Sequence, residues 1–187
     1  MAFVIRDNAL DFHRIAIEAD RVVLKSISAD FTDEVFRHFT PEITRFMMPA
    51  APASIEDTQN FVTSALAGLD RREDLHLAIC ARDTGEFFGI CGFHERGQPA
   101  EPELGIWLKK AAQGNGYGLE AIAALKGWAE AHIEFERLIY PVDRRNMPSR
   151  RIAEALNGSI IEQRKVTSMS GTELDEVVYA IARGAGR

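Results

Sequence analysis

The stretch LKKAAQGNGYGLEA, residues 108–121, carries three glycines at alternate positions directly before a segment with helical periodicity. Glycine weakens a helix start unless the backbone there must approach another group closely. The first turn of a helix has unpaired N–H groups and partial positive charge, so a loop at a helix N-terminus is a natural anion site. Gly114, Gly116 and Gly118 therefore predict a loop that binds phosphate groups through its backbone.

Three kinds of phosphate loop compete for this stretch. A nucleoside-triphosphate P-loop requires G-x-x-x-x-G-K-[ST], and the chain contains no Gly-Lys-Ser or Gly-Lys-Thr. A dinucleotide fingerprint requires G-x-G-x-x-G, but Leu119 occupies its third glycine position when the count starts at Gly114. Gln113, Gly116 and Gly118 do satisfy Q/R-x-x-G-x-G/A. In such a loop successive amides, rather than a lysine, hold a pyrophosphate.

Composition and charge limit the classes of protein to which the chain can belong. The chain has 187 residues, 46% hydrophobic and 27% charged, which predicts one soluble globular domain over residues 1–187. It has no apolar run near the ~20 residues that span a bilayer and no signal-peptide pattern at its start. We therefore expect a cytoplasmic protein without a membrane partner. The net charge of −6 argues against a nucleic-acid partner, which would require a basic surface.

The cysteines and histidines predict no special chemistry. Cys80 and Cys91 lie inside strand-like runs and are expected to be small buried hydrophobic residues. The five histidines lack metal-ligand spacing, so we expect no metal site.

Periodicity predicts a mixed α/β chain in the order ββααβββαβαββ, around one largely antiparallel sheet. Helical spacing begins after residue 29, is interrupted by Pro41 and resumes after Ser54, which forms a capping pattern with Asp57. The expected elements are a strand–turn–strand over 12–28, helices over 29–47 and from 55, a hairpin over 75–95, a strand over 102–110, a helix over 119–133, a strand over 136–143, a short helix over 148–158 and a closing hairpin over 159–182.

Residues 103–129 resemble the acetyl-CoA-binding motif of the GNAT superfamily of N-acetyltransferases, in particular the branch of the ribosomal-protein N-terminal acetyltransferases. That motif runs Glu-[Ile/Leu]-Gly-aromatic-x-Leu, then G-x-G-aromatic-[Ala/Gly]-x-Glu-Ala. The residues at or within one position of it are Glu103, Gly105, Trp107, Gly116, Tyr117, Gly118, Glu120 and Ala121. The resemblance continues through RVVLKSI (21–27), DTGEFFGICGF (83–93), NMPSRRIAEAL (146–156) and GTELDEVVYAIAR (171–183).

The resemblance implies a fold and a donor. The fold would be the GNAT fold, an α/β arrangement with a mostly antiparallel twisted sheet of about seven strands, about four flanking helices and a core over about residues 21–183. The donor would be acetyl-CoA. Its pyrophosphate would contact the amides of the loop, and its pantetheine would pair with the backbone of the preceding strand. The pyrophosphate contacts would be made by Gln113, Gly114, Asn115, Gly116, Tyr117 and Gly118. The pantetheine contacts would be made by Ile106, Trp107 and Leu108.

The resemblance also implies catalytic residues. Glu103 stands where some family members keep an acid that draws the proton from the amine, although a Glu at a strand start is also often just solvated. His94 and Glu95 are fallback bases at the end of the neighbouring strand. Asn146 and Ser149 match an N-x-x-S motif, in which the Asn lies beside the pantetheine and the Ser reaches the sulfur or a water. Ser149 has the alternative role of a helix cap.

The chain departs from the family in two places. Many members have a tyrosine acid further along the N-x-x-S helix. This chain has none there, so we expect Ser149 or water to serve, and Tyr140 to be core. Residues 155–158 replace the usual Lys-Leu-Gly-Phe but still provide a left-handed cap at Asn157–Gly158. Arg144 and Arg145 are candidates for the 3′-phosphate of CoA or are simply solvated.

The sequence thus predicts an N-acetyltransferase that transfers an acetyl group from acetyl-CoA to a primary amine by direct attack. Two alternatives stay open, a different acyl donor on the same fold and a catalytically silent acyl-CoA-binding module. The amine can be a protein or peptide N-terminus or a small molecule, and residues ~30 to 50 are expected to shape its pocket. A homodimer is the default for such proteins and nothing in the sequence decides it.

Overall fold

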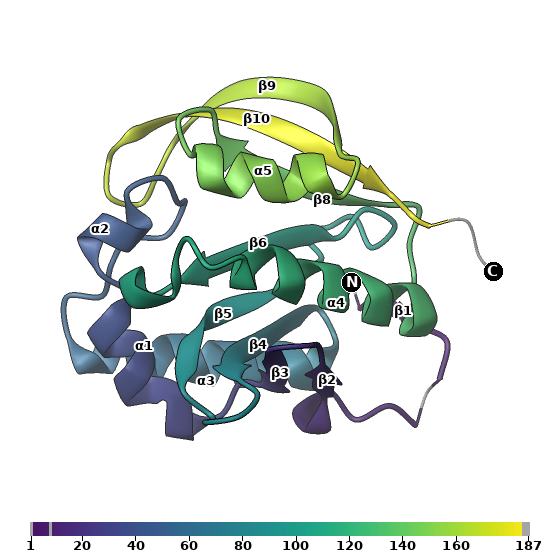
Figure 1. The fold of residues 1–187 in the computed structure, drawn as a ribbon, viewed down its shortest axis with the longest axis horizontal. Helices are drawn as coiled ribbons and strands as arrows, with labels where there is room; N and C mark the ends of the chain where they lie inside the picture. Colours follow the sequence, from purple (N-terminus) through teal and green to yellow (C-terminus); the bar gives the residue numbers. More distant parts are fainter. Residues whose placement is uncertain (1, 8, 185–187) are drawn as a thin grey trace.

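A large mostly antiparallel sheet organises the chain, whose computed structural model describes residues 2–7 and 9–184 (Figure 1). Its eight strands follow the order β2-β3-β4-β5-β6-β8-β10-β9, and β1 and β7 form a separate two-stranded pair. The strands of the main sheet are β2 (Ala16–Glu18), β3 (Val22–Ser26), β4 (Asp74–Ala81), β5 (Phe87–His94), β6 (Glu103–Leu108), β8 (Arg137–Asp143), β9 (Ser159–Thr167) and β10 (Glu173–Ala182), and the small pair is β1 (Val4–Ile5) and β7 (Ile133–Glu134).

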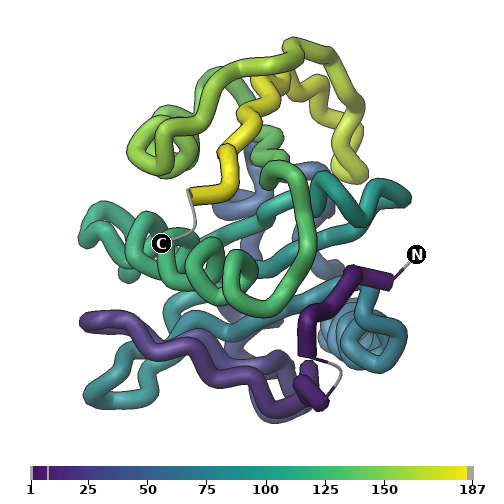
Figure 2. The backbone as a smooth tube through the Cα atoms, turned by 90° about the vertical axis from the view of Figure 1, so that its right-hand side faces the viewer, coloured from purple at the N-terminus to yellow at the C-terminus, as the bar shows by residue number. Residues whose placement is uncertain are grey.

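Helices cover both faces of this sheet. Within the described residues the α-helices are α1 (Thr32–His38), α2 (Pro41–Thr44), α3 (Ile55–Arg71), α4 (Tyr117–His132) and α5 (Met147–Ala155). Figure 2 shows α3 and α4 on opposite sides of the strands. Helix α4 buries Ile122 and Leu125 on its apolar face, and α3 buries Val62 and Leu69 in the same way. The sheet is therefore the middle layer of three.

The parallel pair β6 and β8 is the exception in the main sheet. Its register contains one pair, Glu103 with Ile139, whereas β5 pairs with β6 along six residues. Beyond that pair the two strands diverge. We call the opening between residues 104–108 of β6 and residues 140–143 of β8 the β6–β8 notch. The backbone edge of β6 that borders it is not used by β8.

The predicted element order is confirmed, with local differences at element ends. Pro41 separates two helices and occupies the first turn of α2, where its missing N–H costs nothing. The capping box of Ser54 and Asp57 forms as predicted. Asn157 adopts φ 59°, which ends α5 as expected. The sheet has the eight strands of the predicted element order, one more than the about seven that the resemblance implies, and the β1–β7 pair was not predicted.

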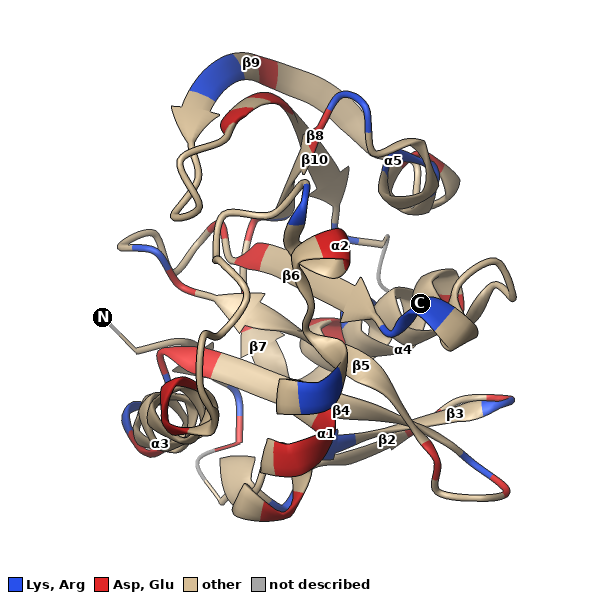
Figure 3. Ribbon diagram, turned by 90° about the vertical axis from the view of Figure 1, so that its left-hand side faces the viewer, with Lys and Arg blue, Asp and Glu red and all other residues tan. Residues whose placement is uncertain are grey.

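Charged side chains are mixed in sign over the surface. Figure 3 shows Lys and Arg interspersed with Asp and Glu around α3 and along the β9–β10 hairpin. Among the residues that the structure describes, no helix is both long and apolar enough to cross a bilayer.

Gly92 in β5 tests how tightly the central strands pack. A Cβ added there would lie 2.0 Å from the carbonyl oxygen of Leu75 on β4, which is backbone and cannot swing away. We expect Gly92→Ala to lower the free energy of unfolding by about 3 kcal/mol or more. Urea denaturation followed by circular dichroism measures the difference.

Gly127→Ala provides the matched control. Gly127 lies in α4 with no heavy atom within 4 Å of an added Cβ. Alanine favours a helix interior, so this variant should be unchanged or more stable by about 0.5–1 kcal/mol. Equal stability of Gly92→Ala and the wild type would contradict the close strand packing.

Candidate functional site

The phosphate loop enters α4 through two glycines with left-handed backbone. Gly114 has φ 79° and Gly116, the N-cap of α4, has φ 82°. Residues other than glycine are strained in this left-handed backbone conformation. Residues 113–116 are exposed. The alternating glycines therefore let the chain turn tightly while the loop backbone stays open to solvent.

Amide groups of this loop are available for a ligand. Across residues 2–7 and 9–184, no backbone or side-chain acceptor receives a hydrogen bond from the amides of residues 114–116. The amides of residues 117–119 open the helix, whose first backbone bond back to the loop is from Glu120 to Gly116 O. The side-chain amide of Gln113 donates to Leu108 O at the end of β6, and that of Asn115 donates to Gln113 O in the loop, at 3.0 Å each. These features fit a pyrophosphate held by backbone N–H groups.

A brace from Arg21, the residue directly before β3, holds the loop in this shape. Arg21 donates its backbone N–H and its guanidinium Nε to the carboxylate of Glu120, at 2.5 and 2.8 Å, and its Nη1 to Asn115 O at 3.1 Å. The same guanidinium lies over the ring of Tyr117, which stacks on Phe88 of β5 at 4.6 Å. The start of α4 is thereby tied to two strands. Sequence analysis did not identify Arg21, although it is the first residue of the segment that resembles the family's opening strand.

Burial opposes ionisation of Glu120, but hydrogen bonds from Arg21 and from the amide of Val22 outweigh it. The pKa of the Glu120 carboxyl is lowered as a result. The brace is therefore strongest when this carboxylate is charged.

The side chains of β6 alternate between the two faces of the sheet. Trp107 is buried against Phe39 and Phe87 on one face. Ile106 and Leu108 point to the other face, where their Cδ1 atoms lie 3.6 and 3.5 Å from the Cβ position of Gly118 in α4. Only the backbone of these three β6 residues borders the notch. A bound pantetheine would meet that backbone rather than the Trp107 ring.

The N-terminus of α5 brings a hydroxyl pair to the β8 side of the notch. Asn146 is the N-cap, and its Oδ1 accepts a hydrogen bond from the amide of Ser149 at 3.4 Å. The Ser149 hydroxyl is 2.8 Å from the hydroxyl of Tyr140, a buried residue of β8. Burial raises the pKa of Tyr140 to about 12, so its phenol stays protonated. Tyr140 is core, as expected, but sequence analysis missed its contact with Ser149.

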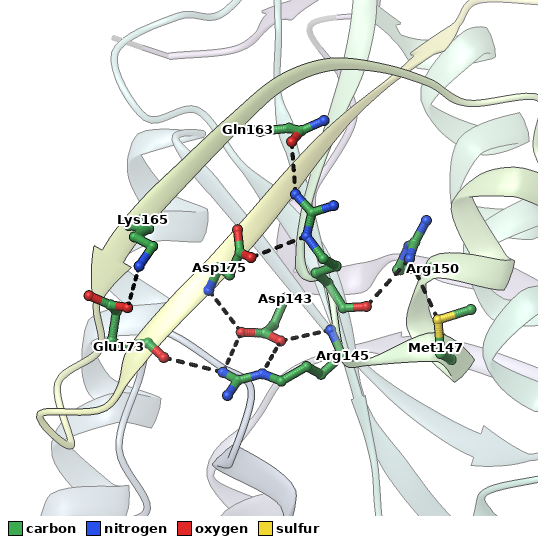
Figure 4. Close-up of polar contacts among 9 residues, drawn as sticks. Asp143, Arg145, Met147, Arg150, Gln163, Lys165, Glu173 and Asp175 are labelled. Carbon is green, nitrogen blue, oxygen red and sulfur yellow. Dashed lines mark hydrogen bonds and ion pairs between the residues drawn. The ribbon is translucent and has the colours of Figure 1, made fainter.

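Arg144 and Arg145 hold the turn between β8 and α5 (Figure 4). Arg145 forms a bidentate pair with the buried Asp143 at 2.8 Å for both contacts. Arg144 binds Asp175 at 3.1 Å and Gln163 at 2.8 Å. Both arginines are thus engaged by the closing hairpin. Their side chains also remain about half exposed, and a contact with the 3′-phosphate of CoA stays a prediction.

Burial raises the pKa of the Asp143 carboxyl, but hydrogen bonds from Arg145 and from the amide of Asp175 outweigh burial and lower it overall. Asp143 also accepts from the amide of Arg145 at 2.9 Å. This charged carboxylate shapes the turn that places Asn146 at the start of α5.

Proton-accepting side chains gather at the start of β6, on the face opposite α4. Glu103 lies 3.6 Å from Arg96 and keeps about a quarter of its side chain exposed. Register places His94 directly across from it on β5. His94 Nδ1 is 2.9 Å from Asp74 Oδ1. The structure therefore brings the expected base and its first fallback together, while Glu95, the second fallback, is buried.

Two surface depressions, of about 410 and 290 Å³, lie away from these residues. The larger is bordered by Val4, Phe135 and Arg183, and the smaller by His13 and Asp70. Neither includes a residue of the phosphate loop. The candidate site is an open loop beside a gap in a sheet, so its chemistry, rather than a closed cavity, identifies it.

Comparison with known proteins agrees with this geometry. The sequence profile of the acetyltransferase (GNAT) domain matches residues 21–158, which include the loop, the notch and α5. An uncharacterized N-acetyltransferase, p20 of Bacillus licheniformis, is 22% identical over 144 residues, which cover 74% of this chain and 79% of that protein.

Solved structures share the fold at low sequence identity. An acetyltransferase of the GNAT family from Bacillus anthracis superimposes with a TM-score of 0.77 at 20% identity, covering 91% of this chain and all of that one. RimL, a ribosomal L7/L12 alpha-N-protein acetyltransferase in complex with coenzyme A, gives 0.80 at 16% identity, covering 92% of this chain and all of that one. At these identities the likeness establishes the fold.

Glu120→Gln tests the brace between β3 and α4. Removing the charge weakens the bonds to Arg21, so we expect a loss of about 1–3 kcal/mol in the free energy of unfolding at pH 7. Because the pKa of Glu120 is lowered on folding, its contribution is complete above the usual Glu range and fades as the pH falls below about 4. Denaturant unfolding at pH 7 and at pH 3.5 checks both points.

Glu173→Gln is the control, because Glu173 pairs with Lys165 at 2.8 Å while both side chains are about two-thirds exposed. Such a surface pair should have little effect on stability. A Glu120→Gln variant as stable as the wild type at pH 7 would rule out the brace.

Proposed function

The chain belongs to the GNAT family of acetyltransferases, and from this premise we propose that it transfers an acetyl group from acetyl-CoA to a primary amine. The observation that carries the proposal is the loop over residues 113–118, whose left-handed glycines and amides without an acceptor at residues 114–116, among the described residues, suit a pyrophosphate. The absence of a Gly-Lys-[Ser/Thr] sequence separates this loop from a triphosphate site, and Leu119 at the third glycine position separates it from a dinucleotide site.

The donor would lie along β6. Its pyrophosphate would rest on the loop amides at the start of α4, where the helix dipole adds favourable charge. The pantetheine would run back along the backbone of residues 106–108, which β8 leaves unpaired. The thioester would then lie in the β6–β8 notch. Held in this way, it presents its carbonyl to an amine from the opposite face, which replaces a bimolecular encounter by a positioned one.

Two side chains of the notch then have separate tasks. Glu103 would draw a proton from the attacking amine, directly or through water. Ser149 would pass a proton to the departing thiolate, and its hydrogen bond to the Tyr140 hydroxyl supports this role. Asn146 would lie beside the pantetheine, since it caps the helix that carries Ser149.

The acceptor is a primary amine, either the α-amine of a protein or peptide or that of a small molecule. Residues 42–48, in α2 and directly after it, would border it, because they contact both sides of the site. Lys110, next to the phosphate loop, binds Glu42 at 2.6 Å. Further along, Arg145 lies over the ring of Phe46, and the amide of Met169 donates to Met48 O.

A thiol-release assay with acetyl-CoA tests the proposed function directly. Peptides, amino acids and polyamines are offered as acceptors, and free CoA thiol is followed over time. We expect steady release with at least one amine and a stoichiometric N-acetylated product by mass spectrometry. Tight acetyl-CoA binding with no turnover on any amine would indicate a silent binding module, and turnover only with another acyl-CoA would indicate a different donor.

Gly116→Asp tests the phosphate cradle. A carboxylate at this position would repel the pyrophosphate and would strain a backbone with φ 82°. We expect the Kd for acetyl-CoA, measured by calorimetry, to rise by at least about tenfold, which corresponds to ~1.4 kcal/mol.

Gly171→Asp is the matched control, since Gly171 has φ 81°, lies in the β9–β10 turn and has no atom within 4 Å of an added Cβ. It repeats the added charge and the backbone strain away from the loop, so acetyl-CoA binding should remain. Unchanged binding by Gly116→Asp would refute the cradle.

A further inference from the structure

We propose that His94, oriented by Asp74, is a second proton-accepting residue of this reaction and takes a proton from the acceptor ammonium. The inference rests on the proposed acetyl transfer and adds a catalytic residue to it. It is drawn from a side-chain pair on β4 and β5 that lies at the start of the notch.

The Asp74 carboxylate selects one tautomer of His94. The distance from Asp74 Oδ1 to His94 Nδ1 is 2.9 Å. The hydrogen bond to His94 lowers the pKa of the Asp74 carboxyl, and although burial opposes it, the carboxyl stays ionised. An ionised carboxylate accepts the Nδ1–H proton, so the neutral imidazole carries its free lone pair on Nε2. That nitrogen is then ready to accept a proton.

Gly105 gives the imidazole access to β6. A Cβ added at Gly105 would lie 3.0 Å from His94 Nε2, so the ring lies directly over this residue. Gly105 lies two residues after Glu103, the residue of β6 that pairs with β8, and so lies near the start of the notch. The Nε2 lone pair is therefore held beside the backbone that would carry the thioester end of the pantetheine.

The other titratable groups that face His94 are His76, Arg96 and Glu103. His76 of β4 lies 4.9 Å away between ring centroids, and on its other side it meets Phe61 of α3. Burial, followed by the nearby His94, lowers the pKa of His76 to about 3. His76 thus stays neutral at physiological pH and adds no competing charge. The remaining charged neighbours, Arg96 and Glu103, are paired with each other at 3.6 Å.

The stoichiometry of the reaction is consistent with two proton acceptors. An ammonium and a thioester give an amide, a thiol and one proton, so the nitrogen loses two protons in total. The first N–H bond breaks as its proton passes to His94 Nε2, and the free amine then forms the C–N bond as the C–S bond breaks. The second proton leaves through Glu103, and the thiolate is protonated through Ser149. The imidazolium returns its proton to water.

An imidazole suits the first step better than a carboxylate does. A neutral imidazole nitrogen is a stronger base than a carboxylate, so it takes a proton from an ammonium at a smaller cost in free energy. Glu103 lies directly across from His94 in the register of β5 and β6, so the two proton acceptors lie side by side.

The experiment measures kcat/KM against pH for His94→Gln in the full chain, with the amine found by thiol release. At pH 7 we expect a loss of about 10²-fold, which shrinks as the pH approaches the pKa of the free amine. The Kd for acetyl-CoA should be unchanged. His13→Gln is the control, because His13 forms a similar pair with Asp70 at 2.8 Å on the exposed surface, and its profile should match the wild type.

Asp74→Asn separates orientation from folding. It should lower kcat/KM by less than His94→Gln and shift the acidic limb of the profile, whereas a purely structural role would lower stability and leave the limb in place. Imidazole ¹⁵N NMR of the wild type at pH 8 should show the proton of His94 on Nδ1. A proton on Nε2, or a wild-type pH profile in His94→Gln, would overturn the inference while acetyl transfer itself stands. No thiol release by the wild type with any amine would instead overturn the proposed function.

Discussion

The divergence of two parallel strands determines how this molecule can work. After the single pair of Glu103 with Ile139, β6 and β8 separate, and the sheet opens in its middle. A sheet normally satisfies the backbone of every internal strand, so an unpaired edge inside it is open to a ligand. The two faces of the sheet then have different roles. On one face α4 and α5 present the phosphate loop and the Ser149–Tyr140 hydroxyl pair, and on the other the start of β6 presents Glu103 and His94.

The loop at the end of β6 depends on contacts that its own sequence does not contain. Gly114 and Gly116 allow its backbone shape, but glycine by itself leaves a chain flexible. Arg21 supplies the missing rigidity through the carboxylate of Glu120 and the ring of Tyr117. The rigidity of the loop therefore comes from a residue that is distant in the sequence.

Signals within short stretches of the sequence predicted the helices and strands well. They could not predict contacts between residues that are far apart in the sequence. The glycine spacing, the Ser54 capping box and the Asn157 helix stop each depend on residues within a few positions. The pairing of His94 with Asp74 joins residues 20 apart, and that of Arg21 with Glu120 joins residues 99 apart. The hydrophobic periodicity of a segment gives no information about contacts over such sequence separations. Arg144 and Arg145 illustrate the same limit, because their partners come from β8 and from a hairpin that closes later in the chain.

Amide hydrogen exchange is the most direct measurement of the central claim that loop amides hold the pyrophosphate. Exchange is followed by mass spectrometry for residues 113–119 in the free protein, with CoA, and with pantetheine, which lacks the pyrophosphate. The account predicts strong protection of these amides with CoA and little with pantetheine at comparable occupancy. Equal protection by both ligands, or protection by CoA only outside this loop, would contradict it.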